Sequence, residues 1–301
     1  MAAIEVHNLC KRYGKVTALD HLSFTVEKGE LFGLIGPDGA GKTTLFRLLA
    51  TLLNPDEGSA TVEGFDIVGD YRSIREIVGY MPGRFSLYQD LSVEENLDFF
   101  AALFGTRVAD AYELIEPVYK QIEPFKTRRA GKLSGGMKQK LALSCALIHR
   151  PKVLFLDEPT TGVDAVSRSE FWDMLSDLKQ RGITILVSTP YMDEASRCDR
   201  VALCNEGRIL TIDTPCHIVE NFDKRLYAVS GDNKFTLLNV SRAVSGVVEC
   251  YPFGSAHHIV ADAAFDENEF IAQATLAGVK NVALYPAEPT IEDVFINLMK
   301  Q

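Results

Sequence analysis

Residues 36–43 read GPDGAGKT, between the apolar run ELFGLI (30–35) and the helix-like run TLFRLLATLL (44–53). The segment matches the pattern G-x-x-x-x-G-K-[ST], in its required position between a strand and a helix. Its glycines allow successive backbone N–H groups to point into one concavity, and the positive end of the helix dipole faces the same space. The stretch therefore predicts a phosphate-binding loop in an α/β fold, at the end of a buried strand.

The residue types of this loop give individual positions a task. Lys42 is expected to reach the β- and γ-phosphates of a nucleotide, and the hydroxyl of Thr43 to hold Mg²⁺. The backbone of the loop would surround the remaining phosphate oxygens. The residues expected to bind the nucleotide here are Gly36, Pro37, Asp38, Gly39, Ala40, Gly41, Lys42, Thr43 and Thr44.

A second apolar run, VLFL (153–156), ends in two carboxylates, Asp157 and Glu158. A strand-end carboxylate beside a phosphate loop supports Mg²⁺ through its water shell, so Asp157 is expected to be a metal-binding residue. Glu158 is placed to polarise or deprotonate an attacking water. We therefore expect Glu158 and Lys42 to be the catalytic residues.

Further segments, read in chain order, resemble one known family. These segments are Tyr13 within KRYGKVTAL (11–19), the loop at 36–43, LSGGMKQK (133–140), LFLDEPTTGVD (154–164) and STPYMDEA (188–195). Over about residues 3–220 the chain resembles the ATP-binding cassette (ABC) ATPases. Its end, AEPTIEDVFINLM (287–299), is similar to the C-terminal extension of ABC-2-type exporter ATPases, the drug- and antibiotic-export-like group.

The resemblance implies further site residues. Tyr13 would stack on the adenine of ATP, with Val16 beside it. In this family the signature residues bind the γ-phosphate held by the opposite subunit, so each ATP site needs two cassettes; the signature residues here are Ser134, Gly135 and Gly136. Residues 162–164 match the loop that links the two sites across such a dimer. A second cassette, as an identical or a different chain, is therefore an expected partner.

The expected fold is a P-loop NTPase core of the ABC ATPase type, an α/β fold with an antiparallel β subdomain and a helical subdomain at about 84–150. This cassette is expected to occupy residues 1–222. Residues 223–301 show the order βαββαβ, which predicts a small ferredoxin-like α+β domain that regulates or braces the dimer. Capping boxes are expected at Ser92 with Glu95 and at Thr290 with Asp293.

The resemblance also places a partner on the helical subdomain. There the segment FSLYQDLSVEENL (85–97) would line a groove that receives a cytoplasmic helix of a membrane permease. The alternative interpretation is that Phe85, Leu87 and Tyr88 are ordinary core residues.

Three positions depart from the family pattern. Pro190 stands where most cassettes have a histidine that contacts the γ-phosphate, and Gly83 where they have a glutamine that touches Mg²⁺. Asp38 replaces the usual asparagine of the loop. Ser188 faces the same side of its strand as residue 190 but lies about 7 Å lower, which makes it a poor substitute. Gln89 could replace the missing glutamine only through an unusual loop fold.

Composition narrows the class of protein. The 301 residues are 47% hydrophobic and 24% charged, as in an ordinary globular chain. The net charge of −10 argues against nucleic acid as a partner, since phosphate binding needs a basic face. One basic run, KTRRAGK (126–132), is interpreted as a solvated loop. The six cysteines form no CxxC pair and are expected to be reduced and mostly buried.

Together these features predict an ATP-binding and ATP-hydrolysing subunit that powers an ABC-2-type exporter through a separate integral membrane permease. No apolar run approaches the ~20 residues that span a bilayer, so the chain is expected to be cytoplasmic and to lie on the inner face of the membrane through that permease. One alternative is a weakly hydrolysing ATP-binding switch paired with a second cassette. Another is an ABC ATPase unconnected with transport.

Overall fold

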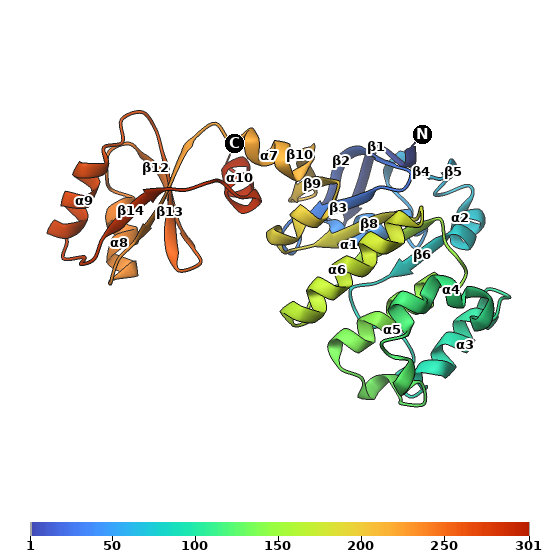
Figure 1. The fold of residues 1–301 in the computed structure, drawn as a ribbon. Helices are drawn as coiled ribbons and strands as arrows, with labels where there is room; N and C mark the ends of the chain where they lie inside the picture. The colour runs from blue at the N-terminus through green and yellow to red at the C-terminus, as the bar shows by residue number, and fades with distance from the viewer. Residues whose placement is uncertain (1, 301) are drawn as a thin grey trace. The chain divides into compact units, whose positions relative to one another are not determined.

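The computed structural model describes residues 2–300, and the chain divides into two compact units, the first ending at Pro215 and the second beginning at Cys216 (Figure 1). The boundary expected near residue 222 lies just after the short helix α7 (Pro215–Glu220). Each unit has its own hydrophobic core and is described by itself.

A six-stranded sheet forms the centre of the first unit, in the order β10-β9-β3-β8-β7-β6. Its strands are β3 (Leu31–Ile35), β6 (Val78–Met81), β7 (Val153–Asp157), β8 (Thr184–Thr189), β9 (Arg200–Asn205) and β10 (Arg208–Asp213). All neighbours pair in parallel except β9 and β10, which form a hairpin that turns at residues 206–207. The strands β3, β7 and β8 are buried along their whole length, and their residues are apolar or glycine except for Asp157 at the end of β7 and for Thr184, Ser188 and Thr189 of β8.

An antiparallel sheet of order β2-β1-β4-β5 packs beside it. Its strands are β1 (Ala2–Tyr13), β2 (Val16–Glu27), β4 (Glu57–Val62) and β5 (Phe65–Asp66). The segment KRYGKVTAL (11–19) belongs largely to this hairpin, because β1 and β2 continue to a tight turn at residues 14–15 and Tyr13 pairs with Val16. Register shifts within this hairpin break the alternation of apolar and polar residues, which hides the strands in the sequence.

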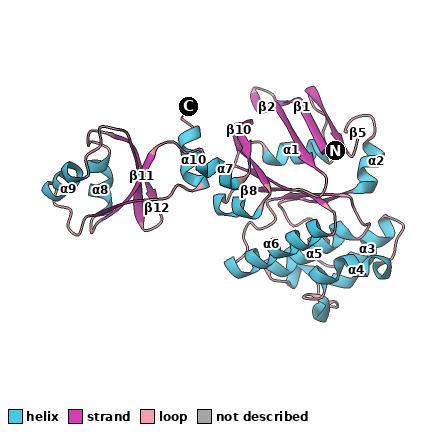
Figure 2. Ribbon diagram, turned by 45° about the horizontal axis from the view of Figure 1, so that its top comes forward, coloured by secondary structure: helices cyan, strands magenta, loops and turns pink. Residues whose placement is uncertain are grey.

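Helices cover both faces of the six-stranded sheet (Figure 2). Helix α1 (Lys42–Leu49) lies between the two sheets, where Phe46 meets Phe155 edge to face. On the other face lie α3 (Val93–Leu103), α4 (Val108–Tyr119), α5 (Gly135–Leu147) and α6 (Ala165–Gln180). The capping box of Ser92 with Glu95 is confirmed at the start of α3.

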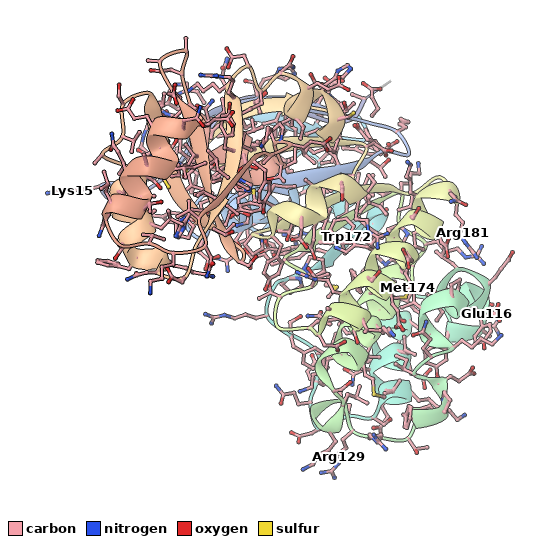
Figure 3. All side chains as sticks on the ribbon, turned by 60° about the vertical axis from the view of Figure 1, so that its left-hand side comes forward. Lys15, Glu116, Arg129, Trp172, Met174 and Arg181 are labelled. Carbon is pink, nitrogen blue, oxygen red and sulfur yellow. The ribbon has the colours of Figure 1, made fainter. Side chains whose placement is uncertain are left out.

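The remaining helical segments of this unit are α2 (Tyr71–Ile77) and the short 3-10 helices η1 (Glu123–Phe125), η2 (Ala130–Lys132) and η3 (Met192–Arg197). Pro117 lies within α4, in its last turn before Tyr119. Figure 3 shows Trp172 and Met174 of α6 among the buried side chains, with Arg129 and Arg181 at the surface.

The second unit has the strand order β12-β13-β11-β14, which is the split βαβ arrangement of a ferredoxin-like domain. Its strands are β11 (Arg225–Ser230), β12 (Val247–Phe253), β13 (Ala256–Ala261) and β14 (Ala283–Pro286), and its further helices are α8 (Lys234–Ser241), α9 (Glu267–Leu276) and α10 (Ile291–Leu298). Tyr227 packs with α8 and α9, whereas its neighbour Leu226 packs on the opposite face with Ile296 of α10. The capping box of Thr290 with Asp293 is confirmed.

The expected fold class is thus confirmed in both units. None of the helices within residues 2–300 is long and apolar enough to cross a membrane. The six cysteines are free, and five of them are buried, with Cys216 the exposed one.

Candidate functional site

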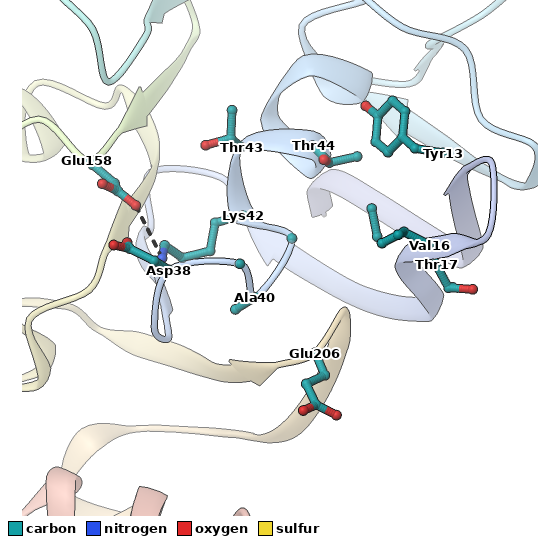
Figure 4. A pocket seen from close by; sticks show the side chains of 13 residues that line it. Tyr13, Val16, Thr17, Asp38, Ala40, Lys42, Thr43, Thr44, Glu158 and Glu206 are labelled. Carbon is teal, nitrogen blue, oxygen red and sulfur yellow. Dashed lines mark ion pairs between the residues drawn. The ribbon is translucent and has the colours of Figure 1, made fainter.

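A cavity of about 510 Å³ opens over the N-terminus of α1 (Figure 4). Four segments of the chain meet in it: the phosphate loop, the tip of the β1–β2 hairpin, the residue after β7 and the turn between β9 and β10. The lining residues are Tyr13, Val16, Thr17, Ala18, Asp38, Gly39, Ala40, Gly41, Lys42, Thr43, Thr44, Glu158 and Glu206. Gly36 and Pro37 are not among them, but their backbone carbonyl oxygens accept hydrogen bonds from Nζ of Lys42.

The hairpin tip gives the cavity an apolar wall. Tyr13 ends β1 and Val16 begins β2, and both side chains are exposed (45% and 65%). An aromatic ring left this open beside a phosphate loop can stack on a base, since every base offers a π-face. Tyr13 and Val16 thus line the same cavity as the phosphate loop, and their contact with adenine stays a prediction.

The backbone of the loop depends on a glycine at position 41. Gly41 has a φ of +92°, and a Cβ there would lie 2.3 Å from the carbonyl oxygen of Ala18. A side chain is therefore excluded both by the backbone conformation and by the neighbouring strand. This close approach allows α1 to begin directly at Lys42, with its N-terminus facing the cavity.

Lys42 is buried under the loop. Its Nζ donates to the carbonyl oxygens of Gly36 (2.7 Å) and Pro37 (3.0 Å) and lies 3.2 Å from Oε1 of Glu158. The ammonium group thus already has acceptors around it. A bound phosphate would take over some of these contacts, and the ion pair holds Lys42 and Glu158 at the same point of the cavity.

The two acids at the end of β7 have different surroundings. Asp157 is 2% exposed, and its Oδ1 accepts a hydrogen bond of 2.8 Å from Oγ of Ser188 on the neighbouring strand β8. Glu158 is partly exposed and has a φ of +48°, a left-handed conformation that is uncommon for residues other than glycine. The backbone N–H of Glu158 donates to both O (3.1 Å) and Oγ (3.0 Å) of Ser188.

Ser188 is the contact that sequence reasoning missed. In the parallel pairing of β7 with β8, Asp157 lies opposite Ser188. A hydroxyl directly after the apolar run ITILV was the available signal, but its partner depends on which strands are neighbours.

The donor set fits Mg²⁺. The hydroxyl of Thr43 and the carboxylate of Asp157 are hard oxygen ligands, the kind that this ion prefers in phosphate sites. Ser188 engages only one oxygen of Asp157, which leaves the other to accept from the water shell of a metal.

The signature residues lie apart from this cavity. Ser134 is the N-cap of α5 and accepts a hydrogen bond from the backbone N–H of Met137 (3.4 Å), and it is exposed together with Gly135. A Cβ on Gly136 would lie 2.9 Å from Oγ of Ser167, so α5 and α6 approach too closely there for a side chain. The N-terminus of α5 is therefore exposed at the signature residues, and these residues do not line the cavity formed by the phosphate loop of the same chain.

Comparisons with known proteins agree with this geometry. The family model described as ABC transporter matches residues 19–161. Nod factor export ATP-binding protein I of Sinorhizobium fredii is 35% identical over 302 residues, which cover 98% of this chain and 85% of that protein. The chain belongs to the ABC transporter ATP-binding proteins.

Two further likenesses extend the comparison. Probable multidrug ABC transporter ATP-binding protein YbhF of Escherichia coli K12 is 44% identical over 249 residues, 81% of this chain. The match spans only 43% of the length of that relative. A solved ATP-binding subunit of an ABC transporter superposes with a TM-score of 0.66 at 29% identity, and the match covers 73% of this chain and 93% of that one. The resemblance inferred from the motifs is thus confirmed.

Within this ABC cassette, the departures from the family pattern have a clear structural setting. A Cβ on Gly83 would lie 3.0 Å from the carbonyl oxygen of Asp157, so a longer side chain there would start beside the acid predicted to bind Mg²⁺. Pro190 follows the last residue of β8 and is not among the residues that line the cavity. Gln89 does not replace the missing glutamine, because its carbonyl accepts from the N–H of Gly131 and its side chain packs there.

A second cavity of the cassette, of about 610 Å³, lies between the helical region and β6. It is mostly apolar, and its lining residues are Ala50, Leu52, Ile74, Arg75, Glu76, Val78, Tyr80, Met81, Pro82, Ser86, Leu87, Phe100, Leu103, Phe104, Ala142, Cys145, Ala146 and His149. Phe85, Leu87 and Tyr88 were expected either to line a groove for the permease or to be core residues, and of these Leu87 lines the cavity. Phe85 instead lies 5.5 Å from the ammonium of Lys138, and Tyr88 packs edge to face against Phe99.

Proposed function

We propose that this protein is the ATP-hydrolysing subunit of an ABC-2-type exporter and acts on a separate permease. The family membership supports the ATP-binding part. The export part is supported by the names of relatives, a multidrug and a Nod factor export ATP-binding protein. The ABC-2 group is supported by the final segment, AEPTIEDVFINLM (287–299), which resembles the C-terminal extension of that group.

The observation that carries the proposal is the arrangement of Tyr13, Lys42 and Glu158 around one cavity. Tyr13 would hold the adenine, and Lys42 would bind the β- and γ-phosphates at the other end of the loop. Glu158 would then face the γ-phosphate and accept a proton from the attacking water. Mg²⁺, held through Thr43 and Asp157, would neutralise negative charge on the phosphates.

The position of the signature supports action as a dimer. Ser134, Gly135 and Gly136 do not line the cavity of their own chain, and they leave a helix N-terminus open. Such a terminus attracts phosphate. A second cassette would therefore complete each site, so that ATP binding closes two chains together and hydrolysis with product release reopens them.

The apolar cavity beside the helical region supports a permease as the partner. Leu52 and Leu103 are exposed by more than half at its edge (54% and 65%). A cytoplasmic helix of a permease could cover these residues with its apolar face. Through this contact the chain would lie on the inner face of the membrane.

The decisive experiment measures Mg-ATP turnover by the purified chain and by a Glu158→Gln variant. We expect turnover in the wild type and a fall of about 100-fold or more in the variant, because the base is lost. ATP binding should persist, since Lys42 is released from its ion pair. Equal turnover in both proteins would rule out hydrolysis by this chain.

A second candidate function is an ATP-binding switch that is paired with a different, fully equipped cassette. Pro190 favours it, because a proline cannot supply the donor that the family aims at the γ-phosphate. Loss of one such donor elsewhere costs ~10²–10³ in rate. Mixing that second cassette with the wild type and with Glu158→Gln would distinguish the two functions, because turnover by a pair in which this chain is only a switch would survive the loss of Glu158.

A further inference from the structure

The end of strand β8 lies beside both acids of the site. Ser188, the residue before Thr189 at this end, has no exposed surface. Its hydroxyl contacts the side chain of Asp157 and the backbone of Glu158, which are adjacent in sequence but have different tasks.

The hydroxyl uses its one proton toward Asp157. It donates to Oδ1 at 2.8 Å, and this bond is buried. A carboxylate can rotate about its bond to Cβ, so a donor on one oxygen fixes the plane of the group and the direction of the other oxygen. That other oxygen is the one left for the water shell of Mg²⁺.

A lone pair of the same hydroxyl holds Glu158. The N–H of Glu158 donates to Oγ at 3.0 Å and to the carbonyl oxygen of Ser188 at 3.1 Å. These bonds secure the left-handed backbone of Glu158 (φ +48°). From that conformation the side chain reaches Nζ of Lys42 at 3.2 Å.

The next two residues of the chain do not share this task. The hydroxyl of Thr189 donates to Oε2 of Glu194, whose Oε1 also accepts from Thr160 at 2.9 Å. Pro190 has no N–H to donate. In residues 188–190, therefore, the side chain that contacts the acids is that of Ser188.

We propose that Ser188 is a positioning residue of this ATPase, which orients Asp157 toward Mg²⁺ and holds Glu158 in its catalytic conformation. Hydrolysis rests on the proposed function above, but the orientation of Asp157 does not. Ser188 does not replace the missing γ-phosphate donor. It preserves the other half of the machinery, the metal-binding acid and the base, at the strand end where the family histidine is absent.

The test compares Ser188→Ala with a matched variant of the same strand, Thr184→Val. Thr184 is also buried and its Oγ1 accepts from the N–H of Gly29 at 3.0 Å, at the opposite end of β8 from the acids. Each variant removes one buried hydroxyl, which makes two hydrogen bonds at Ser188 and accepts one from Gly29 at Thr184, so both should lose stability and Ser188→Ala somewhat more. A merely structural role for Ser188 would make them behave alike in every other measurement.

Two measurements are made on each full-length variant. The first is the affinity for the non-hydrolysable analogue AMP-PNP with and without Mg²⁺, which needs no turnover. We expect Ser188→Ala to keep the Mg²⁺-free affinity within about twofold and to need about 10-fold more Mg²⁺ for the metal-dependent increase. The second is Mg-ATP turnover, which should fall about 10-fold or more, whereas Thr184→Val should change neither value.

Two further variants keep the test decisive. Ser188→Thr retains a hydroxyl and should restore most of both properties, while Ser188→Cys keeps the volume with a weaker donor and should resemble alanine even if alanine folds poorly. Unchanged Mg²⁺ dependence in Ser188→Ala and Ser188→Cys would overturn the proposal. If the wild type shows no turnover above Glu158→Gln, the proposed function fails, and the analogue-binding measurement still decides the role of Ser188.

Discussion

Oε1 of Glu158 lies 3.2 Å from Nζ of Lys42, and the same Nζ donates to the carbonyl oxygen of Gly36 at 2.7 Å. The predicted base and the predicted phosphate-binding cation thus form an ion pair under the loop. Phosphate binding has to redistribute these contacts. Lys42 would move its charge toward the phosphates, and Glu158 would then be free to face a water.

Replacing the cation tests this exchange of partners. We expect Lys42→Met to weaken ATP binding by about 100-fold or more, because a hydrogen bond to a charged group contributes about 1.5–3 kcal/mol and two phosphates would lose one each. Isothermal titration with Mg-ATP measures the affinity. Lys152→Met, at an exposed lysine outside the cavity, is the control and should bind normally. Normal ATP affinity in Lys42→Met would contradict the assignment.

The exposed ring of Tyr13 supports a second prediction. Stacking of a base on an aromatic side chain is worth about 1–3 kcal/mol, so Tyr13→Ala should weaken ATP binding by about 5- to 100-fold. Tyr13→Phe keeps the ring and should bind as the wild type does. Since Tyr13 is 45% exposed, neither change should lower the melting temperature much. Equal loss in both variants would point to the hydroxyl instead of the ring.

Much of the fold could be predicted because its signals are local. The phosphate loop, the buried strands and both capping boxes depend on residues that are neighbours in the sequence. The hairpin at 11–19 could not be predicted as strand, because its register shifts leave no regular alternation. Segments 71–77 and 78–81, a short helix followed by an edge strand, were also not recognised.

The site divides in the same way. Lys42, Thr43 and the acids at the end of β7 follow from motifs, and Tyr13 and Val16 line the same cavity as Lys42, Thr43 and Glu158. The contact of Ser188 with Asp157 depends on the pairing of β7 with β8, which are joined by a helix, and no local pattern records it. The rings of Phe104 and His149 stack in the second cavity with their centroids 3.9 Å apart. No local pattern predicts this contact either, because the two residues come from different helical segments.

A buried carboxylate in the second unit predicts a pH dependence. Burial favours the neutral form of Asp293, but hydrogen bonds from Thr290, His258 and Tyr251 outweigh it, and the pKa of Asp293 is lowered. A lowered pKa in the folded state means stability that is present above the unfolded value of about 3.9 and is lost as the pH falls through the folded value.

Asp293→Asn tests this network, because it keeps the size of the side chain and removes its charge. We expect a loss of about 1–3 kcal/mol at pH 7, and a difference from the wild type that shrinks below about pH 4. The unfolding of the second unit is measured by hydrogen exchange of the backbone amides of β12 and β13. Tryptophan fluorescence would not report on it, because the single tryptophan, Trp172, lies in the first unit. A difference that stays constant well below that pH would exclude the charge as its cause.

If a permease binds at the apolar cavity beside the helical region, a substitution at its edge should abolish the response to the permease and leave ATP turnover by the isolated chain intact. Leu103 is 65% exposed at its edge, so Leu103→Asp should leave the fold and the ATP turnover of the isolated chain unchanged. In proteoliposomes with the permease, the same variant should lose most of the permease-dependent change in turnover. Leu276→Asp, at an even more exposed leucine of the second unit, is the control. Normal coupling by Leu103→Asp would remove this cavity as the docking site.

The open N-terminus of α5 predicts that one variant can bind ATP and still fail to dimerise. Ser134 is exposed and does not line its own cavity, so Ser134→Arg should leave the ATP affinity of the monomer within about twofold, because no contact to its own nucleotide is lost. In a Glu158→Gln background, where ATP is not consumed, the parent should dimerise with Mg-ATP. The double variant that also carries Ser134→Arg should stay monomeric, because the bulky side chain would occupy the place of the partner's γ-phosphate. Light scattering after size exclusion measures the mass. Dimers that form equally with both proteins would show that the signature does not contact the nucleotide of the partner.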